Sequence, residues 1–264
     1  MKKQMTRQTI VLTGASSGIG AALALELAGP HSNLFLAARN LERLELIANQ
    51  CRDIGAIVKT QILDVGDADA IANWVVSIEE KNQIDIVIAN AGTMETCSFD
   101  GDLETAQQTH RQIDTNLGGC VNLATAVVPF MEKRTKGQII FIASIAALQP
   151  VADIPGYSAS KAGVVAYGEA IYAFLANKGI QVSVICPGFI TTPMNIKYKS
   201  FRPTEMSAEK AAKRIRWAIE KKKPFYAFPL ALLIAIQLGR YLPWWLRRHT
   251  NKPFNFTNKP DTGS

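Results

Sequence analysis

The segment TIVLTGASSGIG, residues 9–20, places a short apolar run directly before a glycine-rich turn. Thr9 to Leu12 has the composition of a buried strand, and a helical pattern begins at about residue 18. Glycines in such a turn let the backbone bend sharply and bring N–H groups at the start of a helix close to a phosphate. Glycine-rich turns after strands are also common as plain loops, so the rest of the chain has to separate these two interpretations.

Predicted strands and helices alternate along most of the chain. Apolar runs typical of strands lie at 9–12, 33–37, 56–62, 84–89, 137–143, 180–185 and 224–228. Helical patterns lie between them, at 18–28, 40–54, 67–81, 103–134, 156–178 and 207–222. Several strands are apolar at consecutive positions, as strands buried on both faces are. This order predicts an α/β fold, in which residues 1–228 form a single doubly wound (Rossmann-type) domain with a parallel seven-stranded sheet and helices on both faces.

The positive charge of the chain is concentrated near its end. The formal net charge of the 264 residues is +7, but residues 1–195 carry 14 basic and 18 acidic groups, a net charge of −4. The remaining residues carry 15 basic and 4 acidic groups, a net charge of +11. A basic excess confined to the last quarter argues against a nucleic-acid-binding domain and requires an explanation for that segment.

Cysteine spacing and the N-terminus bear on the compartment. Cys51, Cys97, Cys120 and Cys186 match neither paired metal-binding spacing nor a dense disulfide framework, so we expect free thiols and no metal site. The apolar run behind the basic residues 1–7 is too short for the core of a signal peptide. These features predict a cytoplasmic protein, and contact with a membrane surface stays open.

The glycine-rich turn has three residues, instead of one, between its first two glycines, Gly14 and Gly18. This spacing resembles that of the classical short-chain dehydrogenase/reductase family, whose other motifs follow here in order. Leu63-Asp64-Val65 follows the third strand, Asn90-Ala91-Gly92 the fourth, and residues 187–192 (PGFITT) the sixth. The chain departs from the family at Ala89, where an asparagine often precedes the second of these motifs.

Three side chains have the spacing of the family's catalytic set. Tyr157 and Lys161 are one helical turn apart, and Ser144 ends the fifth strand 13 positions before Tyr157. Reducing a carbonyl requires a proton donor for the developing alkoxide, and Ser144 can donate a hydrogen bond to the same oxygen. We expect Lys161, together with the positive nicotinamide of the oxidised cofactor, to lower the pKa of Tyr157. The resemblance further implies that Lys161 holds the ribose hydroxyls and that Asn116 is a fourth catalytic residue, which anchors a water passing protons toward Lys161.

The resemblance implies a nicotinamide dinucleotide cofactor. Its predicted binding residues are Gly14, Ser16, Ser17, Gly18, Ile19, Gly20, Arg39, Asp64, Val65, Asn90, Ala91, Gly92, Tyr157, Lys161, Pro187, Gly188, Ile190 and Thr192. The second strand ends in Arg39 and lacks a carboxylate there, which favours NADP(H) over NAD(H) because a guanidinium pairs with a 2′-phosphate. The alternative is that Arg39 is a solvated residue at a helix entry. Ser16 and Ser17 stand where many NADP-preferring relatives carry a second basic residue.

The predicted function is hydride transfer between NADP(H) and a carbonyl or secondary alcohol, with Tyr157 as general acid/base. A non-catalytic nucleotide-binding scaffold, a membrane-associated protein on the same fold, and a lyase or epimerase are the alternatives. The substrate pocket is expected to include Met94, Leu148, Gln149 and residues 189–206. Within the last range, Phe189, Met194, Tyr198 and Phe201 favour an apolar substrate. The resemblance implies a homodimer or homotetramer formed through the two long helices.

Residues 229–250 form an apolar and basic extension. Its apolar run, 230–238, is too short to span a bilayer, and Arg240 and Pro243 break the continuation of that run. Three interpretations remain open: peripheral membrane contact through 229–248, a lid over the substrate pocket, or a subunit contact. Residues 251–264 are predicted to be a disordered tail.

Overall fold

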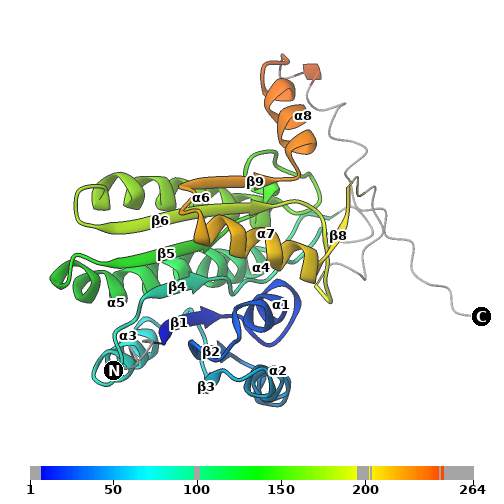
Figure 1. The fold of residues 1–264 in the computed structure, drawn as a ribbon. Coiled ribbons are helices and arrows are strands. Elements are labelled where there is room, and N and C mark those ends of the chain that lie inside the picture. Colours follow the sequence, from blue (N-terminus) through cyan, green and yellow to red (C-terminus); the bar gives the residue numbers. More distant parts are fainter. Residues whose placement is uncertain (1–6, 98–101, 195–201, 203, 244, 247–264) are drawn as a thin grey trace, which may run out of the picture.

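The computed structural model of the protein describes residues 7–97, 102–194, 202, 204–243 and 245–246. Seven parallel strands form one sheet in the order β3-β2-β1-β4-β5-β6-β9 (Figure 1). The strands are β1 (Gln8–Thr13), β2 (Ser32–Ala38), β3 (Ile57–Ile62), β4 (Ile86–Ala89), β5 (Gly137–Ile142), β6 (Ile180–Pro187) and β9 (Phe225–Phe228). The doubly wound fold predicted from the alternating pattern is confirmed.

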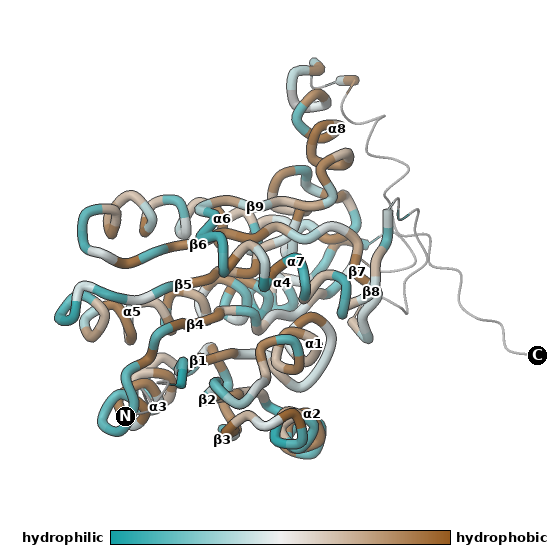
Figure 2. Tube along the Cα trace, viewed as in Figure 1, coloured by the Kyte–Doolittle hydropathy of each residue, from teal (hydrophilic) through white to brown (hydrophobic). Residues whose placement is uncertain are grey.

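Helices cover both faces of the sheet. One core is closed by α1 (Gly18–Leu27), α2 (Leu41–Asp53) and α7 (Ala208–Glu220), and the other by α3 (Ala68–Glu79), α5 (Gly119–Lys133) and α6 (Pro155–Leu175). Along β1, Val11 packs into one core while Ile10 and Leu12 pack into the other. A strand buried on both faces favours apolar residues at consecutive positions, which accounts for the apolar run of β4, coloured brown in Figure 2.

Two local features differ from the prediction. The predicted helix 103–134 is divided into α4 (Ala106–Ile113), a π-helical turn over Asp114–Gly118, and α5. A second, two-stranded parallel sheet joins β7 (Ile190–Thr191) to β8 (Met206–Ser207) and was not predicted. Strands of two residues carry no periodicity in a sequence, so only the folded contacts define them.

The last described helix, α8 (Leu230–Arg240), follows β9 and projects from the body of the molecule (Figure 1). In the part of the chain that the structure describes, no helix is long and apolar enough to cross a membrane. The division of the chain after residue 228 stays a prediction, and the predicted disordered tail 251–264 lies outside the described residues.

Candidate active site

A cleft of about 590 Å³ lies where the strands of the large sheet end. Gly14 follows β1, Arg39 follows β2, Asp64 follows β3, Asn90 follows β4 and Ser144 follows β5, and all five line the cleft. The order of the strands reverses between β1 and β4, and open α/β sheets bind their ligands at such a switch point.

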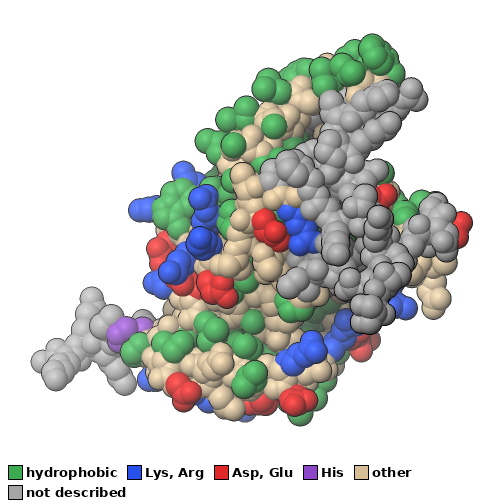
Figure 3. All heavy atoms as spheres, turned by 90° about the vertical axis from the view of Figure 1, so that its right-hand side faces the viewer, with side chains coloured by type: hydrophobic (Ala, Val, Ile, Leu, Met, Phe, Trp, Pro, Cys, Tyr) green, Lys and Arg blue, Asp and Glu red, His purple; other side chains and the backbone are tan. Residues whose placement is uncertain are grey.

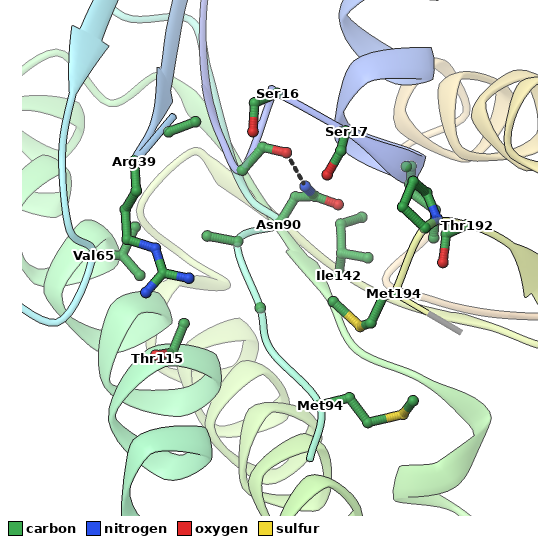
Figure 4. A pocket seen from close by; sticks show the side chains of 18 of the residues that line it. Ser16, Ser17, Arg39, Val65, Asn90, Met94, Thr115, Ile142, Thr192 and Met194 are labelled. Atoms are coloured by element: carbon green, nitrogen blue, oxygen red, sulfur yellow. Dashed lines mark hydrogen bonds between the residues drawn. The ribbon is translucent and has the colours of Figure 1, made fainter. Parts of the chain in front are cut away.

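The structure brings every predicted cofactor-binding residue to this cleft. Its walls include Gly14, Ser16, Ser17, Gly18, Ile19, Gly20, Arg39, Asp64, Val65, Asn90, Ala91, Gly92, Tyr157, Lys161, Pro187, Gly188, Ile190 and Thr192. Figure 4 shows part of the cleft wall, with Arg39 reaching from the end of β2 toward Val65 and Thr115. Their role toward a cofactor stays a prediction.

The glycine-rich turn is packed tightly against the turn that follows β4. Gly14 has a φ of +69°, and a Cβ there would lie 2.7 Å from the Cα of Ala91. A Cβ on Gly20 would lie 2.1 Å from the carbonyl oxygen of Gly14. The Nδ2 of Asn90 donates to the carbonyl oxygen of Thr13 over 3.0 Å and to that of Gly14 over 3.3 Å, the bond drawn in Figure 4. These positions therefore need glycine, because any side chain would push the two turns apart.

The start of α1 is left without a side-chain cap. Within the described residues, the N-cap Ser17 makes no side-chain hydrogen bond and the first turn of α1 carries no acidic residue. By contrast, Asn40, Asp67 and Ser207 cap α2, α3 and α7. The first amides of α1 thus retain hydrogen-bonding capacity at the edge of the cleft, which is the arrangement that accepts a phosphate.

Tyr157 and Lys161 lie on the first turns of α6, with the Lys161 Nζ 5.9 Å from the centre of the Tyr157 ring. Lys161 is 4% exposed, and its Nζ donates to the carbonyl oxygen of Ile142 over 2.9 Å. Burial lowers the pKa of Lys161. Burial also raises the pKa of Tyr157, although a hydrogen bond with Ser144 acts in the opposite direction.

The expected lowering of the Tyr157 pKa is therefore not what the protein chain alone produces. Loss of hydration disfavours the phenolate, and this effect outweighs the hydrogen bond from Ser144. The protein's own groups therefore favour the protonated form of Tyr157, which suits a proton donor.

Asn116 is fully buried in the π-helical turn and does not line the cleft. Its Oδ1 accepts from the Thr93 N–H over 2.7 Å, and its Nδ2 donates to the Thr93 carbonyl and the Ser160 hydroxyl, both over 2.9 Å. A Cβ on Gly92 would lie 3.0 Å from the Asn116 Oδ1 and 3.5 Å from the Lys161 Nζ. Asn116 thus joins the segment after β4 to α6 beside Lys161, while its role in a proton relay stays a prediction.

Two buried cysteines near Lys161 are excluded as nucleophiles. Burial raises the pKa of Cys120 to about 11 and that of Cys186 to about 12. Both thiols are therefore protonated at neutral pH. All four cysteines are free, and the described residues contain no group of acidic, histidine or cysteine side chains that could hold a metal ion.

A second, smaller cavity of about 110 Å³ adjoins the cleft. Ser144, Tyr157, Met94 and Gly188 line both spaces. The other walls of the small cavity are Ile145, Ala146, Gln149, Val151, Ile154, Phe189, Arg202, Leu232 and Ile236. Of the residues predicted for the substrate pocket, Met94, Gln149 and Phe189 lie here and Met194 lies in the larger cleft. Leu148 packs beside the small cavity, and Tyr198 and Phe201 lie outside the described residues.

The family model for short chain dehydrogenases matches residues 8–203. This part of the chain contains all the residues predicted to bind the cofactor and all those predicted to be catalytic. The chain belongs to the short-chain dehydrogenase/reductase family. It is 30% identical over 241 residues to an uncharacterized oxidoreductase of Myxococcus xanthus. The matched region covers 91% of this chain and 94% of that protein.

Solved structures of this family show the same fold. A short-chain dehydrogenase from Sphingobium yanoikuyae in complex with NADPH is 25% identical, with a TM-score of 0.77 and coverage of 96% of this chain and 99% of that one. An actinorhodin polyketide ketoreductase with NADPH is also 25% identical, with a TM-score of 0.75 and coverage of 85% and 95%.

Several residues of this short-chain dehydrogenase/reductase site were not predicted. Arg43, on the first turn of α2, lines the cleft together with Arg39. It lies on the first turn of the helix that begins just after Arg39, and a second basic residue so soon after the second strand was the signal that could have found it. Leu232 and Ile236 of α8 were not predicted individually, because the apolar pattern of α8 does not say which side of the helix is buried.

Glu104 is a further residue that the motifs did not reveal. It is 6% exposed, and its Oε2 accepts from the Gln112 side chain over 2.9 Å and from the Gly156 N–H over 3.2 Å. Gly156 precedes Tyr157, so Glu104 fixes the beginning of α6 to α4. This contact depends on folding and leaves no local pattern in the sequence.

Replacing Glu104 by alanine is expected to lower the free energy of unfolding by about 2 kcal/mol, because buried donors lose a charged acceptor. In a thermal melt this corresponds to a decrease in Tm of roughly 4–8 °C. The matched control is Glu220→Ala, which removes an exposed carboxylate paired with Arg216 and is expected to change Tm very little. Equal melting temperatures of the two variants would contradict this role of Glu104.

Proposed function

We propose that this protein is an NADP(H)-dependent oxidoreductase that interconverts an apolar carbonyl compound and its alcohol. The observation that carries the proposal is the position of Ser144 and Tyr157, which line both the large cleft and the small cavity. Groups bound in the two spaces meet at these two hydroxyls. A scaffold that binds only a nucleotide has no use for such a junction.

The large cleft fits a dinucleotide phosphate. Among the described residues, its charged walls are Arg39, Arg43, Lys161 and a single carboxylate, Asp64. The amides of α1 can receive the pyrophosphate, and the two arginines at the end of β2 can pair with a 2′-phosphate. The NADPH bound by two structural neighbours supports the same preference over NAD(H). The chemistry that NADPH supplies when bound is a hydride for a carbonyl carbon.

The protein's own groups handle the proton. The Tyr157 hydroxyl donates a proton to the oxygen that becomes an alkoxide, and the Ser144 hydroxyl hydrogen-bonds to that oxygen as its charge grows. Lys161 places a positive charge behind the phenol and holds the ribose side of the site. Asn116 keeps the segment after β4 in position, and its water relay toward Lys161 belongs to the proposal.

The substrate and the assembly are part of the same proposal. Ile145, Phe189, Leu232 and Ile236 give the small cavity an apolar wall, which fits an apolar substrate. Tyr172 and Phe174 expose large apolar side chains on α6, which supports a homodimer or homotetramer through the long helices. A cytoplasmic location stays a prediction.

A carbonyl panel tests the reaction class. The full chain is incubated with ketones and aldehydes of increasing apolar character, with NADPH or NADH, and consumption of reduced cofactor is followed. Net consumption that is faster with NADPH supports the proposal. Binding of NADPH without consumption would indicate a scaffold, and conversion of a substrate without net consumption would indicate a lyase or epimerase.

The pH dependence of the two directions is expected to be opposite. Because burial raises the pKa of Tyr157, the proton donor stays protonated through neutral pH, and the reduction rate is expected to be flat there and to fall only at alkaline pH. Oxidation requires the phenolate, so its rate is expected to rise with pH. Initial rates in both directions across a pH series check this. A reduction rate that rises with pH through neutrality would contradict Tyr157 as the acid.

A further inference from the structure

The two sides of α8 have different surroundings. Leu232 and Ile236, each 8% exposed, pack with Ile145 and line the small cavity beside Tyr157. Leu230, Ile234 and Leu238 are 65%, 50% and 66% exposed. Their spacing of four residues places these three, called the outer stripe below, on the side of the helix opposite the cavity. Tyr241, 88% exposed, extends the stripe just after the helix.

An apolar stripe of this kind requires a partner. A helix that is apolar on two opposite sides is normally buried on both, whereas in the described structure the outer stripe faces solvent. Figure 3 shows hydrophobic side chains gathered over this projecting helix, with Lys and Arg side chains grouped on the surface beside its base.

The charge beside α8 identifies the kind of partner. On α7, Lys210, Arg214, Trp217 and Lys221 are exposed at positions i, i+4, i+7 and i+11, and are called the basic stripe below. The Arg214 guanidinium lies 5.7 Å from the centre of the Phe228 ring, two residues before α8 begins. Trp217 stacks near Tyr226 of β9, with ring centres 5.3 Å apart. The basic stripe therefore runs along β9 to the base of α8.

The acidic side chains of α7 lie off the basic stripe. Helical spacing places Glu209 and Glu220 on another side of α7, and Glu220 pairs with Arg216, which also pairs with Glu26 of α1. Exposed leucines with adjacent lysine, arginine and tryptophan form a surface that suits an anionic lipid layer. A second copy of this chain seated on α8 would instead bring together two segments with a net charge of +11 each, which disfavours self-association through this surface.

We infer that α8 seats the protein on an anionic membrane surface through the outer stripe, with the basic stripe against the lipid headgroups. The opposite side of the same helix is a wall of the small cavity. Docking therefore brings the substrate pocket to the lipid surface, where an apolar substrate is concentrated. The docking itself does not rest on the proposed reaction, because it depends only on the outer surface of α7 and α8.

Vesicle sedimentation of the full chain tests this inference. The wild-type chain is expected to bind vesicles of phosphatidylcholine with phosphatidylglycerol about 10-fold or more better than vesicles of phosphatidylcholine alone, and added salt is expected to weaken this binding. Replacing the outer stripe by Leu230→Ser, Ile234→Ser and Leu238→Ser is expected to reduce binding about 10-fold or more. Arg214→Gln with Lys221→Gln is expected to remove the preference for anionic vesicles.

A matched variant and a second measurement keep the test decisive. Leu46→Ser, Ile54→Ser and Ile57→Ser remove three exposed apolar side chains elsewhere and are expected to leave vesicle binding unchanged. A thermal melt of the same samples reports folding, and NADPH turnover with a water-soluble ketone reports the proposed reaction separately. Equal sedimentation of the wild type and the outer-stripe variant would overturn the inference. So would a wild-type dimer that becomes a monomer in the outer-stripe variant without any vesicle binding, because α8 would then be a subunit contact.

Discussion

Tyr157→Phe is expected to lower the rate of carbonyl reduction by about 100- to 10,000-fold, the range typical for removal of a general acid. The substitution keeps the aromatic ring and removes only the hydroxyl that lies between the two cavities. Lys161 retains its hydrogen bond to the Ile142 carbonyl, so the cleft keeps its shape. The dissociation constant of NADPH is therefore expected to change very little.

The matched control is Tyr172→Phe, which removes a hydroxyl from an exposed tyrosine on the same helix. Turnover and NADPH binding by fluorescence are measured for both variants. Tyr157→Phe with nearly wild-type turnover would exclude Tyr157 as the proton donor. Equal loss of turnover and of NADPH binding would show instead that the hydroxyl supports cofactor binding.

Arg39→Ala is expected to raise the KM for NADPH by about 10- to 150-fold, because a charged hydrogen-bonded contact of about 1.5–3 kcal/mol with the 2′-phosphate is lost. The KM for NADH is expected to stay nearly constant, since that cofactor has no 2′-phosphate. Adding Arg43→Ala is expected to increase the loss further, because both arginines line the same part of the cleft.

Arg52→Ala provides the control, because Arg52 lies on α2, away from the cleft lining, and pairs with Glu45 at the surface. Steady-state kinetics with both cofactors compares the three variants. Equal changes for NADPH and NADH in Arg39→Ala would contradict a 2′-phosphate contact and would favour Arg39 as a solvated residue at the start of α2.

The sheet could be predicted because its inner strands carry apolar runs buried on both faces, as β4 does throughout. The edge strand β3 is mostly exposed and contains Lys59, Thr60 and Gln61, so only its place between helical patterns marked it as a strand. The π-helical turn at Asn116 could not be predicted from the sequence. It occurs where Asn116 forms hydrogen bonds with residues 93 and 160, which are distant in the sequence. The pairing of β7 with β8 likewise depends on a contact between residues 190 and 206. Local patterns therefore identified the elements, and long-range contacts determined where they break.

The residues of the cleft were predictable because each motif follows a strand and the carboxyl ends of parallel strands meet at one edge. The raised pKa of Tyr157 could not be predicted, because it results from loss of hydration, and the sequence does not show how deeply this side chain is buried. The role of α8 stayed open for a related reason. Its apolar residues occur on two sides, and only the fold shows that Leu232 and Ile236 reach the small cavity.

Deuterium labelling of the cofactor measures hydride transfer itself. The full chain is incubated with NADPH deuterated on the transferring side of nicotinamide C4 and with the best ketone from the carbonyl panel, and the alcohol is analysed by mass spectrometry. We expect one deuterium on the carbinol carbon of the product. When Tyr157→Phe replaces the wild type, we expect almost no labelled alcohol to form in the same time. Alcohol formed without deuterium from either face of the labelled cofactor would contradict hydride transfer and with it the proposed function.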